Sequence, residues 1–293
     1  MPIKSGSYTA LLTPFTDGGE AIDHAALEAL VEHNIGHGVN GLYVGGSTAE
    51  TYLQTYEERV SVLQAVAKQA KGRVSIIAQV GDINPSVCHK LAGVAADAGY
   101  DALSAIPPFY FKYDWAEISE FYRKLASLTG VPFVIYNIPV LTGVTLNTEQ
   151  ITELLNLPNV IGLKNTSPDY YSMEQIVRAN PDKLIFNGYD ETAISGLAMG
   201  ACGVIGSTLN VQGYKFQALQ AAFMNNEPEK ARAIQGEINQ LIDVLAPLGV
   251  FRSIKYLLDL QGVPMGECRQ PFRPLAASDK AALKAAFDTL LAR

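Results

Sequence analysis

The feature that most constrains the fold is an alternation of short apolar runs with longer segments of helical periodicity, repeated eight times. The apolar runs have the length and boundaries of buried strands. They cover residues 8–14, 41–46, 74–80, 102–106, 132–138, 160–167, 184–189 and 203–208. Regular alternation with short connections predicts a parallel sheet, and eight units predict closure into a TIM (β/α)8 barrel, an α/β fold.

Helix signals fill the intervals between these runs. Asp23 is a typical N-cap, and Pro85 after Asn84 is typical of a first helical turn. We expect helices over about 23–36, 56–70, 85–99, 115–128, 148–155, 170–178, 192–199 and 214–225. The alternatives are an open doubly wound sheet or fewer, merged units. No Gly-x-Gly-x-x-Gly follows the first run, which weakens a dinucleotide-binding version.

The chain changes character at its carboxyl end. From Glu227 onward no further strand pattern occurs, and residues 227–245, 251–261 and 278–291 have helical periodicity. We therefore predict a barrel catalytic domain over residues 1–226. Residues 227–293 form a C-terminal helical extension, packed on the barrel or on a neighbouring subunit.

Charge and composition exclude several classes of protein. The net charge of −7 and the pI near 5.2 make a nucleic-acid partner unlikely. No apolar run is long enough to span a bilayer, and the first residues lack the apolar core of a secretory signal. Three scattered cysteines (Cys88, Cys202, Cys268) have neither metal nor redox spacing and suit a cytoplasmic location.

Lys164 stands near the end of the sixth expected strand. Alternation places it on the same face as Gly162, with Ile161 and Leu163 on the other face. The glycine leaves room beside the amine, and partial burial would lower the lysine pKa from about 10.4. A neutral amine can attack a ketone and form a Schiff base. The alternative is a lysine that leaves the strand into water.

Polar residues gather at the ends of five expected strands, where barrels of this class place reactive groups. These segments are 45–50, 136–139, 164–166, 187–191 and 206–208. Ser47 and Thr48 follow two glycines, so this turn could bind a carboxylate, or the hydroxyls could simply cap a helix. Asp190 and Glu191 could be helix N-terminal acids, or they could bind sugar hydroxyls.

Tyr136 is the candidate proton carrier. It shares a strand face with Val134, which would direct it into the barrel mouth, although it could equally be a core tyrosine. All four histidines fall on expected helices outside that mouth: His24, His33, His37 and His89. A histidine-based triad or a zinc-dependent aldolase therefore has no candidate base or ligands.

Six motifs spread over nearly the whole chain carry a family resemblance. They are residues 11–15 (LLTPF), 41–48 (GLYVGGST), 136–139 (YNIP), 162–164 (GLK), 187–191 (NGYDE) and 249–252 (GVFR). In these motifs the chain resembles the Schiff-base aldolase family that contains dihydrodipicolinate synthase and N-acetylneuraminate lyase.

The resemblance implies a lyase that cleaves N-acetylneuraminate reversibly to pyruvate and N-acetylmannosamine, without a cofactor or metal. Lys164 would form the Schiff base, and Ser47 and Thr48 would hold the carboxylate. Tyr136 would take the proton from the substrate hydroxyl, with Ser47 helping to relay it. The sugar chain would be bound by Thr166, Gly188, Asp190, Glu191 and Ser207. Tyr110 matches a tyrosine placed in a neighbouring subunit's site, which implies a homotetramer.

Two positions bear on the branch of the family. The synthase branch usually has an arginine where this chain has Leu141, and an apolar side chain cannot bind a second carboxylate. The family usually has glycine where this chain has Ala49, and alanine would strain the turn if that position needs a positive φ. The alternatives are an aldolase for another 2-keto-3-deoxy sugar acid, a dihydrodipicolinate synthase-like enzyme, and a non-catalytic sugar-acid-binding barrel.

Overall fold

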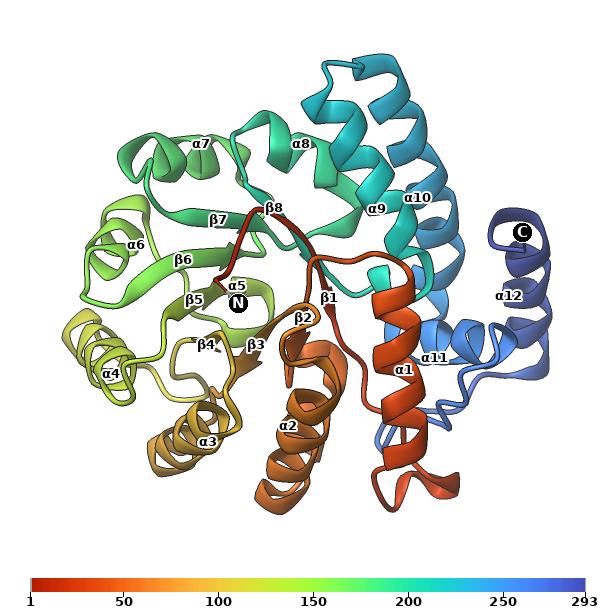
Figure 1. The fold of residues 1–293 in the computed structure, drawn as a ribbon, viewed down its shortest axis with the longest axis horizontal. Coiled ribbons are helices and arrows are strands. Elements are labelled where there is room, and N and C mark those ends of the chain that lie inside the picture. The colour runs from red at the N-terminus through yellow and green to blue at the C-terminus, as the bar shows by residue number, and fades with distance from the viewer. Residues whose placement is uncertain (1, 293) are drawn as a thin grey trace.

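Eight parallel strands close into a barrel in the computed structural model, which describes residues 2–292 (Figure 1). Each strand pairs with its neighbour in sequence, and the last pairs with the first. The strands are β1 (Gly6–Ala10), β2 (Gly41–Val44), β3 (Ser75–Gln79), β4 (Ala102–Ala105), β5 (Phe133–Asn137), β6 (Val160–Asn165), β7 (Leu184–Asn187) and β8 (Gly203–Gly206). The predicted (β/α)8 barrel is confirmed, and the open doubly wound sheet is wrong.

Helices lie outside the barrel and alternate with the strands, so that the last of them follows β8. They are α1 (His24–Gly36), α2 (Tyr56–Ala70), α3 (Pro85–Ala98), α4 (Trp115–Ser127), α6 (Thr148–Leu155), α7 (Tyr170–Ala179), α8 (Ala193–Ala198) and α9 (Leu209–Met224). Local chemistry sets their starts: the side chains of Asp23, Thr55 and Asn147 each accept a hydrogen bond from a backbone N–H in the first turn.

The sequence patterns missed short elements in the loops. A four-residue helix, α5 (Pro139–Thr142), follows β5, and four 3₁₀ helices occur: η1 (Asp17–Gly19), η2 (Ser47–Ala49), η3 (Thr51–Leu53) and η4 (Asp190–Thr192). Helix α9 begins at Leu209 rather than near Tyr214, because it continues an initial turn across a kink at Gln212. A single turn is too short to show a helical period.

A β-bulge in β6 turns the side chain of Ile161 to the opposite face from the one that strand alternation predicted. Phe133 pairs with Val160, but the next residue of β5, Val134, pairs with Gly162, so Ile161 is the extra residue. Ile161 therefore packs against the cluster inside the barrel, whereas Leu163 lies in the outer core between strands and helices. The expectation that Ile161 shares the outer face with Leu163 is wrong.

The predicted extension consists of α10 (Pro228–Leu248), α11 (Val250–Leu260) and α12 (Ala277–Leu290). These helices lie together on one side of the barrel, with α10 beside α9 (Figure 1). Leu241, Leu245 and Leu257 belong to the outer core of the barrel itself. These three helices thus pack against the barrel of their own chain. Across residues 2–292, no helix has both the length and the apolar character needed to cross a bilayer.

Residues 263–275, which we name the strap, lead from α11 back across the barrel. The Phe15 N–H donates to the Met265 carbonyl at 3.0 Å. Gly266 has φ +64°, and a Cβ there would lie 2.1 Å from the Phe15 carbonyl oxygen, so this crossing needs glycine. Farther along the strap, Arg269 donates to the carbonyls of Gly19 and Leu53. The strap therefore ties the extension to the loops after β1 and β2.

Candidate active site

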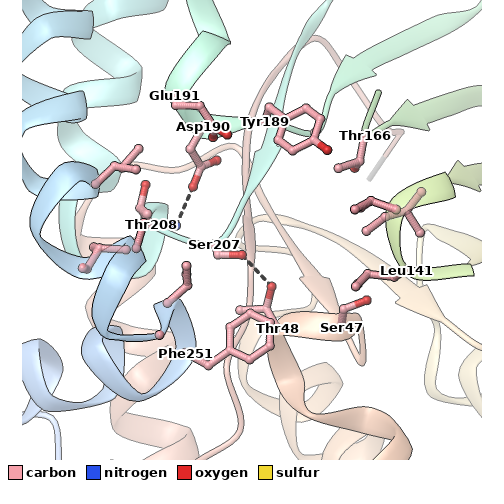
Figure 2. Close-up of a pocket in the computed structure, with 18 of the residues that line it drawn as sticks. Ser47, Thr48, Leu141, Thr166, Tyr189, Asp190, Glu191, Ser207, Thr208 and Phe251 are labelled. Atoms are coloured by element: carbon pink, nitrogen blue, oxygen red, sulfur yellow. Dashed lines mark hydrogen bonds between the residues drawn. The ribbon is translucent and has the colours of Figure 1, made fainter. Parts of the chain in front are cut away.

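A cavity of about 660 Å³ opens at the carboxyl ends of the strands. Its wall comes from the loops after β2, β5, β6, β7 and β8, together with α10, α11 and the strap. Nine of the ten predicted site residues line it: Ser47, Thr48, Tyr136, Lys164, Thr166, Gly188, Asp190, Glu191 and Ser207. Figure 2 shows the hydroxyl and carboxylate groups from these separate loops facing one space.

Lys164 is buried in this cavity rather than pointing into water. Its side chain comes from β6 next to Tyr136 of β5, and the residue is 3% exposed. Nζ lies 4.1 Å from the centroid of the Tyr136 ring and 4.2 Å from that of Tyr43. Burial lowers the pKa of Lys164 to about 7, while the charge of Asp190 acts to raise it. A substantial fraction of this amine is therefore neutral near pH 7.

The salt bridges found among residues 2–292 do not include Lys164. A permanent ion pair would hold the amine in its charged, unreactive form. The arrangement therefore leaves Lys164 available to a substrate.

Tyr136 stands beside this amine. Burial raises the pKa of its phenol to about 12, and the neighbouring hydroxyls of Thr166 and Ser47 act to lower it. The phenol is consequently protonated at neutral pH. A protonated phenol can take a proton from a substrate only if it releases its own proton to another group at the same time.

The turn after β2 presents two hydroxyls to the cavity. Gly45 has φ +77°, and Gly46 lies so close to the Tyr43 ring that a Cβ would be 3.0 Å from it. The hydroxyl oxygens of Thr48 and Ser207 lie 2.7 Å apart (Figure 2). Neither Ser47 nor Thr48 caps a helix through its side chain. The helix-cap interpretation of this turn is therefore not supported.

The structure does not meet the condition under which Ala49 would strain the turn. Ala49 lies inside η2 and is not among the described residues with positive φ. The residue in the left-handed conformation is the next one, Glu50, with φ 56° and ψ 34°. Alanine therefore places no strain on this turn, since only the left-handed region penalises a Cβ.

Asp190 is more than a helix N-terminal acid. It is 6% exposed, and its Oδ2 accepts a hydrogen bond from the Thr208 N–H at 2.7 Å (Figure 2). Its Oδ1 is buried and has no hydrogen-bond partner within the described chain. Burial raises the pKa of Asp190 to about 6. The Oδ1 oxygen packs directly against Gly206 of β8, where it leaves no room for a Cβ, so the carboxylate is held in the wall between η4 and β8.

Gly188 and Glu191 complete this side of the cavity. A Cβ at Gly188 would lie 2.0 Å from Thr166 Oγ1, so this position has no room for a side chain. Glu191 is exposed, at the rim, next to the buried Asp190. This wall therefore presents oxygens at two depths, as a polyhydroxylated chain would need.

Some lining residues were missed by the sequence analysis. Phe251 and Arg252 of α11 and Phe272 and Arg273 of the strap form part of the wall. Residues 249–252 were noticed as a motif, but no role was assigned to them. The strap has no periodic pattern, so no local signal places it at the site.

Tyr110 is the one predicted residue outside this cavity. It is 79% exposed and has φ +79°, in the loop between β4 and α4.

The histidines lie away from the cavity as expected, with His24 and His33 in α1 and His89 in α3, while His37 caps the end of α1. Within residues 2–292, no cluster of His, Cys, Asp or Glu could hold a metal ion.

Comparison with known proteins identifies the family. Residues 4–290 match the model of the dihydrodipicolinate synthetase family. The chain belongs to this family. A curated relative, N-acetylneuraminate lyase of Salmonella typhimurium, is 45% identical over 290 residues, which cover 98% of this chain and 97% of the relative.

Solved structures of this family have the same fold. CdNal from Clostridium difficile in complex with mannosamine superposes with a TM-score of 0.95 at 36% identity, covering 98% of this chain and 99% of that one. N-acetylneuraminate lyase from Fusobacterium nucleatum complexed with pyruvate gives a TM-score of 0.94 at 36% identity, covering 98% and 97%. The family resemblance and the barrel are both confirmed.

Proposed function

We propose that the protein is a Schiff-base aldolase that cleaves N-acetylneuraminate reversibly to pyruvate and N-acetylmannosamine. The observation that carries the proposal is the buried amine of Lys164, with a pKa near 7, in a cavity that also holds a two-hydroxyl turn. The names of the relatives agree with this reaction, since the Salmonella protein is an N-acetylneuraminate lyase and the solved structures hold mannosamine or pyruvate.

The first step joins Lys164 to the substrate. Ser47 and Thr48 would hold the carboxylate, which presents the adjacent ketone of the open-chain sugar to Nζ. The neutral amine attacks the ketone carbon, one proton is taken up from solution, water leaves, and a protonated imine forms. This imine is an electron sink, so no cofactor is required.

The second step breaks the carbon–carbon bond. The hydroxyl proton of the substrate passes to Tyr136, which hands its own proton to Ser47 because the phenol is protonated at neutral pH, and Ser47 passes its hydroxyl proton to the substrate carboxylate that it holds. The bond electrons move into the imine, giving N-acetylmannosamine and the enamine of pyruvate. Protonation of the enamine carbon and hydrolysis of the imine then release pyruvate and restore Lys164.

The remaining predicted residues would bind the sugar chain. Thr166 and Ser207 offer hydroxyls, the carboxylates of Asp190 and Glu191 offer acceptors, and Gly188 lines the cavity beside Thr166. Leu141 is 62% exposed at the cavity wall and offers no charge to a second carboxylate. This feature favours a sugar-acid substrate over the one used by a synthase.

We infer that the enzyme is a homotetramer in which Tyr110 reaches a neighbour's site. Its outward position, against Phe111 at 5.1 Å between ring centroids, supports this arrangement. A cytoplasmic location remains part of the proposal.

Reductive trapping tests the proposed function. Incubation with pyruvate and borohydride should give a covalent adduct that peptide mapping places on Lys164, and Lys164→Ala should give none. The absence of an adduct on the native chain would favour a non-catalytic sugar-acid-binding barrel. Assays with N-acetylneuraminate and other 2-keto-3-deoxy sugar acids then identify the substrate.

A further inference from the structure

Tyr43 is a buried tyrosine of β2 whose ring faces the reactive amine. The ring is fully buried inside the barrel, and Lys164 Nζ lies over it at 4.2 Å from its centroid. The Tyr136 ring lies on another side of Nζ at 4.1 Å, and the two rings meet edge to face at 81°. Both distances are within the range of a cation–π interaction.

The position of this ring is fixed by its surroundings. The Tyr43 hydroxyl donates to Ser104 Oγ on β4 at 3.0 Å. Burial raises the pKa of Tyr43 well above its usual value, so the ring stays neutral. Gly46, in the turn that carries Ser47, packs directly on the same ring. Tyr43 is therefore held in place from two sides.

The other buried lysines show what is unusual about Lys164. Lys255 is 1% exposed and lies 2.8 Å from the carboxylate of Glu50. Lys215 is 3% exposed, with Glu237 at 3.9 Å. Both therefore have a carboxylate partner within 4 Å, whereas Lys164 has none among the salt bridges of residues 2–292 and is instead covered by aromatic faces. A buried cation needs some compensating partner.

We propose that Tyr43 is a catalytic residue whose ring face stabilises the positive charge of the protonated Schiff base on Lys164. This inference rests on the proposed aldolase function. An aromatic face suits this task because it attracts a cation without accepting its proton, whereas a carboxylate could take the proton and remove the electron sink. Tyr136 cannot provide this alone, since its hydroxyl must also move protons during bond cleavage.

The test changes the charge distribution of the ring and keeps its shape. Tyr43→Phe is the reference variant, because it removes the hydroxyl bond to Ser104 but retains the ring. The comparison replaces this phenylalanine with pentafluorophenylalanine, which weakens the attraction of the ring face for cations. The same fluorinated residue at Phe133, in the outer core, is the matched control for any general effect of fluorination.

Two quantities are measured for each protein. One is the rate of carbon–carbon cleavage in a single turnover, and the other is the pH dependence of reductive trapping with pyruvate. Relative to Tyr43→Phe, the fluorinated ring should slow cleavage by about tenfold and move the trapping midpoint down by about one pH unit. The other ionisable groups around the amine, Tyr136, Asp190, Glu191 and Tyr189, are unchanged within the series.

A purely structural role for Tyr43 predicts a different result. Fluorination would then change thermal stability, as it would at Phe133, while the cleavage rate and midpoint would match those of Tyr43→Phe. That result overturns the proposal. If Tyr43→Phe does not fold, a ring-fluorinated tyrosine is placed at position 43 instead. This protein is then compared with the native chain. Failure of the native chain to trap pyruvate would instead refute the aldolase function.

Discussion

At the scale of single residues, the chemistry depends on how the surroundings of Lys164 act on its pKa. Burial lowers this pKa, and the carboxylate of Asp190 opposes the change. Asp190 is itself shifted, with a pKa raised to about 6 by burial. Each group thus spends part of its time neutral near physiological pH, and each affects the other.

The pH dependence of adduct formation follows from the pKa of Lys164 near 7. Below this pH the amine is protonated and cannot attack, so trapping of pyruvate by cyanoborohydride should rise with pH through a midpoint near 7 and then level off. Initial trapping rates between pH 5 and 9 measure it. A midpoint above pH 9 would contradict the buried, partly neutral amine.

Removing the charge of Asp190 should shift the pH midpoint of pyruvate trapping downward. The carboxylate raises the pKa of Lys164, so Asp190→Asn should lower the midpoint for pyruvate trapping. Pyruvate lacks the sugar chain, which separates this effect from lost sugar binding. Glu191→Gln, at the exposed rim, is the matched control and should move the midpoint less. An upward shift in Asp190→Asn would contradict the assigned interaction.

Tyr136→Phe separates imine formation from bond cleavage. The variant keeps the ring over Lys164 but removes the proton carrier, so kcat for N-acetylneuraminate cleavage should fall by about 10²–10⁴-fold. Trapping of the pyruvate adduct on Lys164 should persist. Steady-state kinetics and mass spectrometry measure the two quantities, and a near-normal kcat would refute the proton role.

At the scale of elements, the strap and α11 hold the turn that carries Ser47 and Thr48. Glu50 follows this turn, and its carboxylate lies 2.8 Å from Lys255 of α11, an ion pair without hydrogen-bond geometry. Its other oxygen accepts a hydrogen bond from the Arg269 N–H of the strap at 2.8 Å. The C-terminal helices and the strap therefore reach the turn that carries Ser47 and Thr48 through one buried carboxylate.

Breaking this ion pair should destabilise the protein. Lys255→Met leaves Glu50 buried without its partner, so the free energy of unfolding should fall by about 3–5 kcal/mol. Adding Glu50→Gln to Lys255→Met removes the uncompensated charge and should recover much of this loss. Urea unfolding of the single and double variants measures the coupling. A loss below about 1 kcal/mol in the single variant would contradict it.

At the scale of the whole molecule, the cavity is built by one chain, but Tyr110 is directed outward. An exposed aromatic side chain in a left-handed backbone conformation is unusual. The proposed homotetramer gives this conformation a purpose, because it would place the ring in the neighbouring subunit.

Mixing Tyr110→Ala subunits with Lys164→Ala subunits tests this arrangement. Tyr110→Ala should reduce kcat although the residue lies outside the cavity of its own chain. When its subunits are exchanged with Lys164→Ala subunits, some sites combine an intact Lys164 with an intact neighbouring Tyr110, so activity should increase. Light scattering verifies the oligomer. Unchanged activity in both the variant and the mixture would contradict the shared site.

The sequence alone determined the architecture of this protein and indicated Lys164 and Tyr136 as candidate reactive groups. Strand and helix patterns are local, since period and capping residues such as Asp23 and Asn147 act within a few positions, and the eight units therefore matched the barrel. Lys164 and Tyr136 could be located because parallel strands bring their carboxyl ends to one edge. These inferences required no knowledge of contacts between distant residues.

Only the tertiary structure decided the surroundings of these groups. The bulge at Ile161 depends on the register between β6 and β5. The left-handed residue after Ser47 and Thr48 is Glu50, whose side chain is anchored by α11 and the strap. The Tyr43 ring meets Lys164 only once the barrel closes. Burial, ion pairing and pKa depend on neighbours far apart in the chain, and a local pattern carries no information about them.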